Sequence, residues 1–248
     1  MTDDIDHRVE GGVSWITLNR PETGNALTPD QRDRLVTLLE EASADVAVRV
    51  VVLRAEGRHF CTGADLRAGR GHEGRAGRGH EGPERPPGAP DRPAGTVARM
   101  IATGAQRLIA AVLDCDKPVI AAVGGTAAGI GAHLALACDL VVAADTARFV
   151  EVFVRRGIVP DGGGAYLLPR LTGLHQAKEL VLFGDDLPAE RAERMGLVNA
   201  VVPESTHLEL VQYPFRQSIR AHRGIQRDVT TEGIRGGRGV GGGAANRA

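Results

Sequence analysis

The chain has 248 residues, of which 42% are hydrophobic but only 3% aromatic, so its core must consist mainly of aliphatic side chains. Its 30 basic and 31 acidic residues leave a formal net charge of −1, which favours neither a nucleic-acid nor a membrane partner. The 3 cysteines lack metal-ligand spacing and do not form an even-numbered disulfide framework, which favours a reducing, cytoplasmic location without a bound metal. The polar, acidic start predicts no signal peptide, and we expect no apolar run long enough to span a membrane.

Strand and helix patterns alternate along the chain. β-branched residues predict strands, and the sequence Thr28-Pro-Asp-Gln predicts the start of an amphipathic helix. The predicted strands cover residues 13–18, 48–53, 119–123 and 140–143, and a further helix is predicted at 129–138. This alternation predicts an α/β fold in which helices cover a parallel sheet.

Two segments do not have the composition of a packed domain. Residues 67–95 contain a tandem repeat, RAGRGHEG, followed by a proline-rich run, and predict a flexible surface insertion. His72 and His80 in this insertion suggest metal binding as an alternative, but their spacing in glycine-rich chain makes a poor site. We predict a core at 1–205 and an atypical, disordered tail at 206–248, with an RNA-binding tail or a frameshifted gene end as alternatives.

The octamer HFCTGADL, residues 59–66, follows the strand predicted at 48–53. Open α/β folds place their ligands at the carboxyl ends of strands, and Gly63 allows a tight turn there. The N–H group after such a turn can point into a pocket. Taken alone, the octamer is better explained as a plain strand-to-loop turn.

A second small-residue segment, residues 126–133, opens the helix predicted at 129–138. Small residues allow two backbone segments to approach closely, and the first N–H groups of a helix have no partner within it. One N–H from each segment would hold an enolate oxygen, and the loss of one such donor costs about 10²–10³ in rate. Close helix packing is the alternative explanation of these small residues.

These two segments, in this order, resemble the crotonase superfamily (enoyl-CoA hydratase/isomerase). Further similarity lies in LNRPETGNAL at 18–27, KPVIAAV at 117–123 and RGIVPDGGGAYLLPRLTG at 156–173. The similarity covers residues 8–66 and 96–205, and it implies a ββα spiral core with a helical C-terminal part, here truncated or altered. It also implies acyl-CoA substrates, homotrimers or paired trimers, and no metal or redox cofactor, because coenzyme A arrives with the substrate.

The resemblance implies roles for individual residues at the matching motif positions. Ala64 and Ile130 would donate the two N–H groups that hold the thioester oxygen. The pantetheine and adenine channel would be lined by Asn25, Ala26, Leu27, Ala64, Asp65 and Leu66.

The chain departs from the standard hydratase, in which two glutamates position and activate water. The first glutamate position falls on His133 and the second on Phe153. Glu151 lies two residues before the second position, so loop geometry would be needed to bring its carboxylate into the site. We expect His133 to be either a second acid/base or a helix residue that merely faces the pocket.

Asp161, in the sequence Val159-Pro-Asp-Gly-Gly-Gly, is the remaining candidate acid/base. The motif is similar to that of the subgroup that includes ring-1,2-epoxyphenylacetyl-CoA isomerase, where the equivalent aspartate is the single acid/base. One carboxylate is sufficient to move a proton between two carbons, and such catalysis is worth about 10²–10⁴ in rate. The alternative is that Asp161 caps the helix that follows.

We therefore expect a crotonase-fold enzyme that shifts a carbon–carbon double bond in an enoyl-CoA. Hydration by Asp161 or Glu151 is the first alternative, followed by thioester hydrolysis or dehalogenation with Asp161 as nucleophile, and by a non-catalytic acyl-CoA binder. A genuine tail would lack the family's C-terminal helices, which predicts a weakened oligomer or an open pocket. We expect Cys61 and Cys138 to be buried small hydrophobes rather than nucleophiles.

Overall fold

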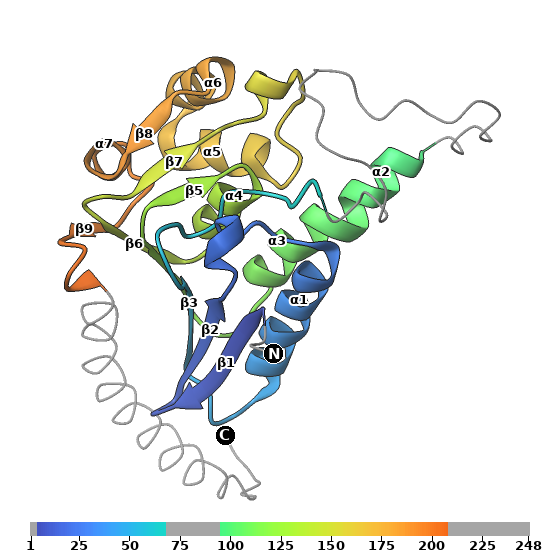
Figure 1. Cartoon of the computed structure of the whole chain (residues 1–248), viewed down its shortest axis with the longest axis vertical. Helices are drawn as coiled ribbons and strands as arrows, with labels where there is room; N and C mark the ends of the chain where they lie inside the picture. The colour runs from blue at the N-terminus through green and yellow to red at the C-terminus, as the bar shows by residue number, and fades with distance from the viewer. Residues whose placement is uncertain (1–3, 68–94, 208–248) are drawn as a thin grey trace, which may run out of the picture. The chain divides into compact units, whose positions relative to one another are not determined.

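A computed structural model describes residues 4–67 and 95–207 of the chain (Figure 1), all of them within one compact unit, Met1–Leu208. The body of the expected insertion and nearly all of the expected tail lie outside the described residues, so both stay predictions. The main sheet has six strands in the order β1-β2-β3-β4-β6-β9. These are β1 (Ile5–Glu10), β2 (Val13–Leu18), β3 (Val50–Ala55), β4 (Val119–Val123), β6 (Leu140–Ala144) and β9 (Ala200–Val202).

The strands β2, β3, β4, β6 and β9 run parallel to their neighbours, and β1 pairs with β2 as an antiparallel hairpin. β4 consists of Val, Ile and Ala residues that are all buried, as expected for a strand covered on both faces of a sheet. The hairpin turns at Gly11 and Gly12, which both have positive φ. The expected parallel, helix-covered sheet is thus confirmed, with one antiparallel edge strand added to it.

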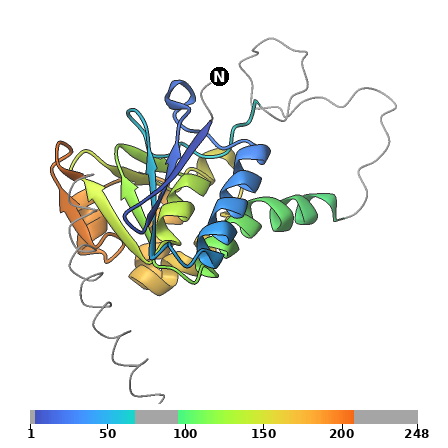
Figure 2. The same ribbon diagram turned by 90° about the horizontal axis from the view of Figure 1, so that it is seen from below.

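Helix α1 (Pro29–Ala44) begins where the sequence predicts. The Thr28 hydroxyl accepts a hydrogen bond from the Gln31 N–H at 3.2 Å, and the Gln31 side-chain oxygen accepts one from the Thr28 N–H at 2.9 Å. This reciprocal pair is a capping box, which satisfies two donors at the start of the helix. The helix packs beside α3 (Arg107–Leu113) on one face of the main sheet (Figure 2).

The run Thr96–Leu113 combines α2 (Thr96–Ile101), a π-helical turn η2 (Ala102–Gln106) and α3. By length and composition this run is long and apolar enough to cross a membrane, contrary to the expectation from the sequence. Its second half nevertheless belongs to the core, because Leu108, Ile109 and Val112 are buried. These side chains account for part of the apolar composition, whereas Val97, Met100 and Leu113 in the same run are exposed.

A smaller sheet and a group of short helices form the rest of the described chain. The sheet has the order β5-β7-β8, with β5 parallel to β7 and β8 antiparallel to it. The elements are β5 (Thr126–Ala128), α4 (Ile130–Leu136), β7 (Arg148–Val150), η3 (Val154–Arg156), α5 (Gly164–Thr172), α6 (Leu174–Phe183), β8 (Asp186–Pro188) and α7 (Ala189–Arg194). The pairing of β5 with β7 brings the segment after β7 to the start of α4.

Candidate active site

Backbone hydrogen bonds join the loop after β3 to strand β5. The Cys61 N–H donates to the Thr126 carbonyl at 3.1 Å, and the Ala128 N–H donates to the Cys61 carbonyl at 2.9 Å. The two small-residue segments that the sequence singles out, 59–66 and 126–133, therefore lie side by side beyond the carboxyl ends of β3 and β4.

Glycines make this close approach possible. A Cβ atom at Gly131 would fall on the carbonyl oxygen of Cys61, so no side chain fits between α4 and this loop. Gly63 has a φ of +116° and Gly129 has a φ of +54°, and L side chains rarely adopt either conformation. The glycines thus fix where α4 begins relative to the loop that carries Ala64.

The backbone N–H groups of Ala64 and Ile130 donate to no other group within residues 4–67 and 95–207. Leu27 bonds to both neighbours of Ala64: its N–H donates to the Gly63 carbonyl at 2.8 Å, and its carbonyl accepts from the Asp65 N–H at 2.9 Å. In such a parallel bridge the N–H of the middle residue, here Ala64, points away from the partner strand that contains Leu27. Ile130 is the first residue of α4, so its N–H has no partner within the helix.

Asp161 lies in the turn that leads into α5, and its side chain is half-buried. The turn packs against α4, because a Cβ atom at Gly162 would lie 3.5 Å from Cγ1 of Ile130. Asp161 therefore precedes, in the chain, a residue that packs against Ile130, which provides one of the free N–H groups. Helix α5 begins at Gly164 with Gly163 as its N-cap and has no side-chain capping bond, so Asp161 does not cap it.

His133 and Glu151 form a buried pair behind this turn. The Nε2 atom of His133 lies 3.1 Å from Oε2 of Glu151, and the two residues are 0% and 5% exposed. The ring of Phe153 stacks on the imidazole at a centroid distance of 5.1 Å and an interplanar angle of 9°. His133 and Phe153, which stand at the two hydratase glutamate positions, are thus neighbours in space. The Glu151 carboxylate lies within hydrogen-bond distance of His133.

The sequence did not predict the pairing of His133 with Glu151, because the position of Glu151 depends on where strand β7 ends. Strand β7 ends at Val150, where the Gly129 N–H donates to the Val150 carbonyl at 3.0 Å. The chain turns after this residue, so the alternation of faces along a strand no longer applies to Glu151. No local sequence signal indicates this pairing, because the two residues lie 18 positions apart. The spacing of three between Ile130 and His133 indicates only that these two residues share one face of a helix.

Among the expected channel residues, Asn25 has a structural side chain. It accepts a hydrogen bond from the Arg20 N–H at 2.8 Å and donates to the carbonyls of Glu56 and His59 at 2.9 and 2.7 Å. Its φ of +55° is also unusual for a residue other than glycine. The Leu27 side chain is buried in the core. The sequence identified Asn25 but gave no indication that its amide would bind the backbone of two loops.

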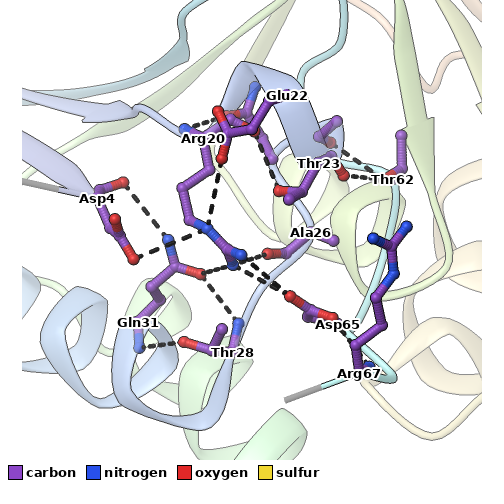
Figure 3. A network of polar contacts seen from close by, with 12 residues as sticks. Asp4, Arg20, Glu22, Thr23, Ala26, Thr28, Gln31, Thr62, Asp65 and Arg67 are labelled. Carbon is purple, nitrogen blue, oxygen red and sulfur yellow. Dashed lines mark hydrogen bonds and ion pairs between the residues drawn. The ribbon is translucent and has the colours of Figure 1, made fainter. Parts of the chain in front are cut away.

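Asp65, a second expected channel residue, binds the guanidinium group of Arg20 (Figure 3). Both terminal nitrogens of Arg20 donate to Oδ2 of Asp65 at 3.2 Å, and one of them also donates to the Ala26 carbonyl at 3.2 Å. This contact ties the loop that carries Ala64 to the loop before α1. The partners lie 45 positions apart, and no local sequence pattern indicates that they pair.

The remaining expected channel residues, Ala26, Ala64 and Leu66, are half-buried or exposed and form the accessible part of this surface. Cys61 and Cys138 are buried, in agreement with their expected role as small hydrophobes. Burial raises the pKa of the Cys61 thiol to about 12 and also raises the pKa of Cys138, which disfavours the nucleophilic thiolate. In the part of the chain that the structure describes, no group of three His, Cys, Asp or Glu residues is placed to hold a metal ion.

Comparisons with known proteins identify the family. The family model for enoyl-CoA hydratase/isomerase matches residues 8–81 and 95–229. The chain is 36% identical over 212 residues to 1,2-epoxyphenylacetyl-CoA isomerase of Escherichia coli, covering 86% of this chain and 74% of that protein. It is also 36% identical over 197 residues to 2,3-dehydroadipyl-CoA hydratase of Escherichia coli, covering 79% and 68%.

A solved enoyl-CoA hydratase from Bacillus anthracis superposes with a TM-score of 0.74 at 29% identity, covering 87% of this chain and 76% of that one. The likeness confirms the expected crotonase fold. The two Escherichia coli relatives have the same identity of 36% but are named for different activities, so similarity identifies the family and does not separate isomerase from hydratase. The chain therefore belongs to the enoyl-CoA hydratase/isomerase family of acyl-CoA-processing enzymes.

Proposed function

We propose that the chain is an enoyl-CoA isomerase that converts a 3-enoyl-CoA into the conjugated 2-enoyl-CoA. The Ala64 and Ile130 N–H groups hold the thioester oxygen, and Asp161 moves the proton. The motif around Asp161 and the isomerase among the similar proteins support this assignment to the isomerase subgroup.

One observation carries the proposal: Asp161 is a half-buried carboxylate that makes no hydrogen bond or ion pair with other described residues. The two other ionisable groups of the site, His133 and Glu151, are buried and form a hydrogen bond with each other. Phe153 offers no proton. A site with one available acid/base suits a reaction in which the same group removes and returns a proton.

The proposed reaction needs no net gain or loss of atoms. The Asp161 carboxylate removes a proton from C2 of the 3-enoyl thioester, and the electrons move onto the thioester oxygen as a dienolate. The two N–H groups stabilise this oxygen, which develops its charge only as the proton leaves. Protonated Asp161 then returns the proton to C4, and the double bond settles between C2 and C3.

Hydration of a 2-enoyl-CoA is the second candidate, because a hydratase is among the relatives at 36% identity. It requires a group that activates water and a group that protonates C2. Asp161 would have to serve both steps, since His133 and Glu151 face each other in the interior. The geometry therefore favours isomerisation over hydration.

A paired assay with 3-enoyl-CoA and 2-enoyl-CoA tests the proposal, with wild type beside Asp161→Asn. We expect wild type to form the conjugated thioester from the 3-enoyl substrate, and Asp161→Asn to lose about 10²–10⁴ in kcat because its amide cannot accept the proton. Formation of 3-hydroxyacyl-CoA from the 2-enoyl substrate without isomerisation would instead establish a hydratase. Tight acyl-CoA binding with no turnover of either substrate would identify a non-catalytic binder.

A further inference from the structure

The imidazole of His133 is enclosed by contacts on several sides. Glu151 lies 3.1 Å from Nε2, and the Phe153 ring is stacked on one face of the imidazole. The side chain has no exposed surface, so it is shielded from solvent. Burial, the contact with Glu151 and the ring stack together restrict the orientation of the imidazole.

The turn that carries Asp161 packs directly on this ring. A Cβ atom at Gly164 would clash with Nε2 of His133, and a Cβ atom at Gly162 would lie 3.1 Å from Nδ1 of the same ring. The glycines that follow Asp161 therefore allow the backbone to rest on the imidazole without an intervening side chain. We expect a movement of the ring to disturb this backbone, which also carries Asp161.

The Nδ1 atom of His133 is buried and has no hydrogen-bond partner among the described residues. No hydrogen bond at Nδ1 therefore holds the ring in place. The polar contact that orients the ring is the hydrogen bond between Nε2 and the Glu151 carboxylate. A buried polar ring with a single hydrogen bond is sensitive to the loss of that bond.

We propose that His133, oriented by Glu151 and Phe153, is a positioning residue for Asp161. The ring supports the Asp161–Gly164 turn and sets the distance between the carboxylate and an acyl group held at the Ile130 N–H. This inference rests on the proposed isomerase function and adds to it a buried Glu151–His133 pair that acts through Asp161. Displacing a catalytic group by about 1 Å costs about 10²-fold in rate, so a small ring movement would be measurable.

The first test compares Glu151→Ala, Glu151→Gln and the surface control Glu179→Ala. Glu179 pairs with Arg191 on α6 and α7, away from the site, so its loss removes a carboxylate without touching the turn. We expect Glu151→Ala to lower kcat by about 10- to 100-fold, with KM and the Kd of a saturated acyl-CoA unchanged within about twofold. The Gln variant retains a side-chain oxygen for Nε2–H and should recover most of kcat.

A role confined to folding predicts a different pattern. Glu151→Ala would then lower the melting temperature while each folded molecule kept its wild-type kcat, and this result would overturn the proposal. Equal losses in Glu151→Ala and Glu151→Gln would also overturn it. If Glu151→Ala does not fold, Phe153→Leu is measured instead, because it removes the ring stack but keeps an apolar side chain. An unchanged kcat in Phe153→Leu would count against the proposal.

The outcomes also separate this proposal from the proposed function. Wild type that does not isomerise a 3-enoyl-CoA overturns both. Wild type that isomerises, with Asp161→Asn inactive and Glu151→Ala at wild-type kcat, leaves the function intact and overturns the positioning role alone.

Discussion

Single glycines decide whether the two N–H donors can lie close to each other. A methyl group at position 131 would collide with the Cys61 carbonyl, which is backbone and cannot move without displacing the loop that carries Ala64. We expect Gly131→Ala to lower kcat by about 10²-fold or more, comparable to the loss of one oxyanion donor, and to destabilise the fold by about 1–3 kcal/mol. Steady-state kinetics and urea unfolding measure the two effects.

Gly124→Ala is the matched control, because a Cβ atom there would meet its nearest neighbour, the His207 ring, at an ordinary distance of 3.6 Å. It should keep kcat within about twofold of wild type, as expected for a substitution that meets no steric obstacle. A Gly131→Ala enzyme with near wild-type kcat would show that the approach of α4 to the Cys61 loop does not set the donor geometry.

The sequence predicts elements better than it predicts contacts between them. Strands such as β4 were predictable because buried parallel strands consist of uninterrupted aliphatic residues. β1 was not, because five of its six residues are exposed and polar residues interrupt its apolar ones. Motifs identify Ala64, Ile130 and Asp161 as candidate site residues, whereas the contacts of Glu151 depend on where β7 ends, which spacing alone does not determine.

At the scale of elements, the start of α1 is connected to the site through its cap. The Gln31 side chain that completes the capping box also accepts a hydrogen bond from Arg20 at 3.3 Å, and Arg20 holds Asp65 (Figure 3). We expect Thr28→Ala to lower the free energy of unfolding by about 1 kcal/mol, because the Gln31 N–H loses its acceptor. Urea unfolding monitored by circular dichroism measures this change.

Thr28→Ser should retain most of the stability, since serine supplies the same hydroxyl. Thr37→Ala serves as the control within α1: the Thr37 hydroxyl donates to the Asp33 carbonyl on the exposed side of the helix, and its loss should change the stability by less than about 0.5 kcal/mol. Equal effects of Thr28→Ala and Thr37→Ala would show that the capping box adds nothing beyond helix propensity.

At the scale of the whole molecule, helices α5 and α6 expose large apolar side chains that a second copy of the chain could cover. Leu174, Leu182 and Phe183 on α6 are 56%, 62% and 67% exposed, and Leu171 on α5 is 42% exposed. Neighbouring exposed apolar side chains, such as Leu182 and Phe183, are typical of a protein–protein interface. We propose that the end of α6, with Leu182 and Phe183, joins subunits of the homo-oligomer that the family resemblance implies.

Light scattering at several protein concentrations tests this proposal. We expect wild type to form a homo-oligomer that dissociates on dilution, because the atypical C-terminal sequence would weaken the assembly. Phe183→Asp should shift the mass to a single chain, since a charge at an apolar interface loses its hydration without gaining a partner. The control is Val46→Asp, which changes a 95% exposed residue after α1 and should leave the mass unchanged. A trimer that persists at every dilution would refute the weakened assembly, and a Phe183→Asp protein with wild-type mass would place the interface elsewhere.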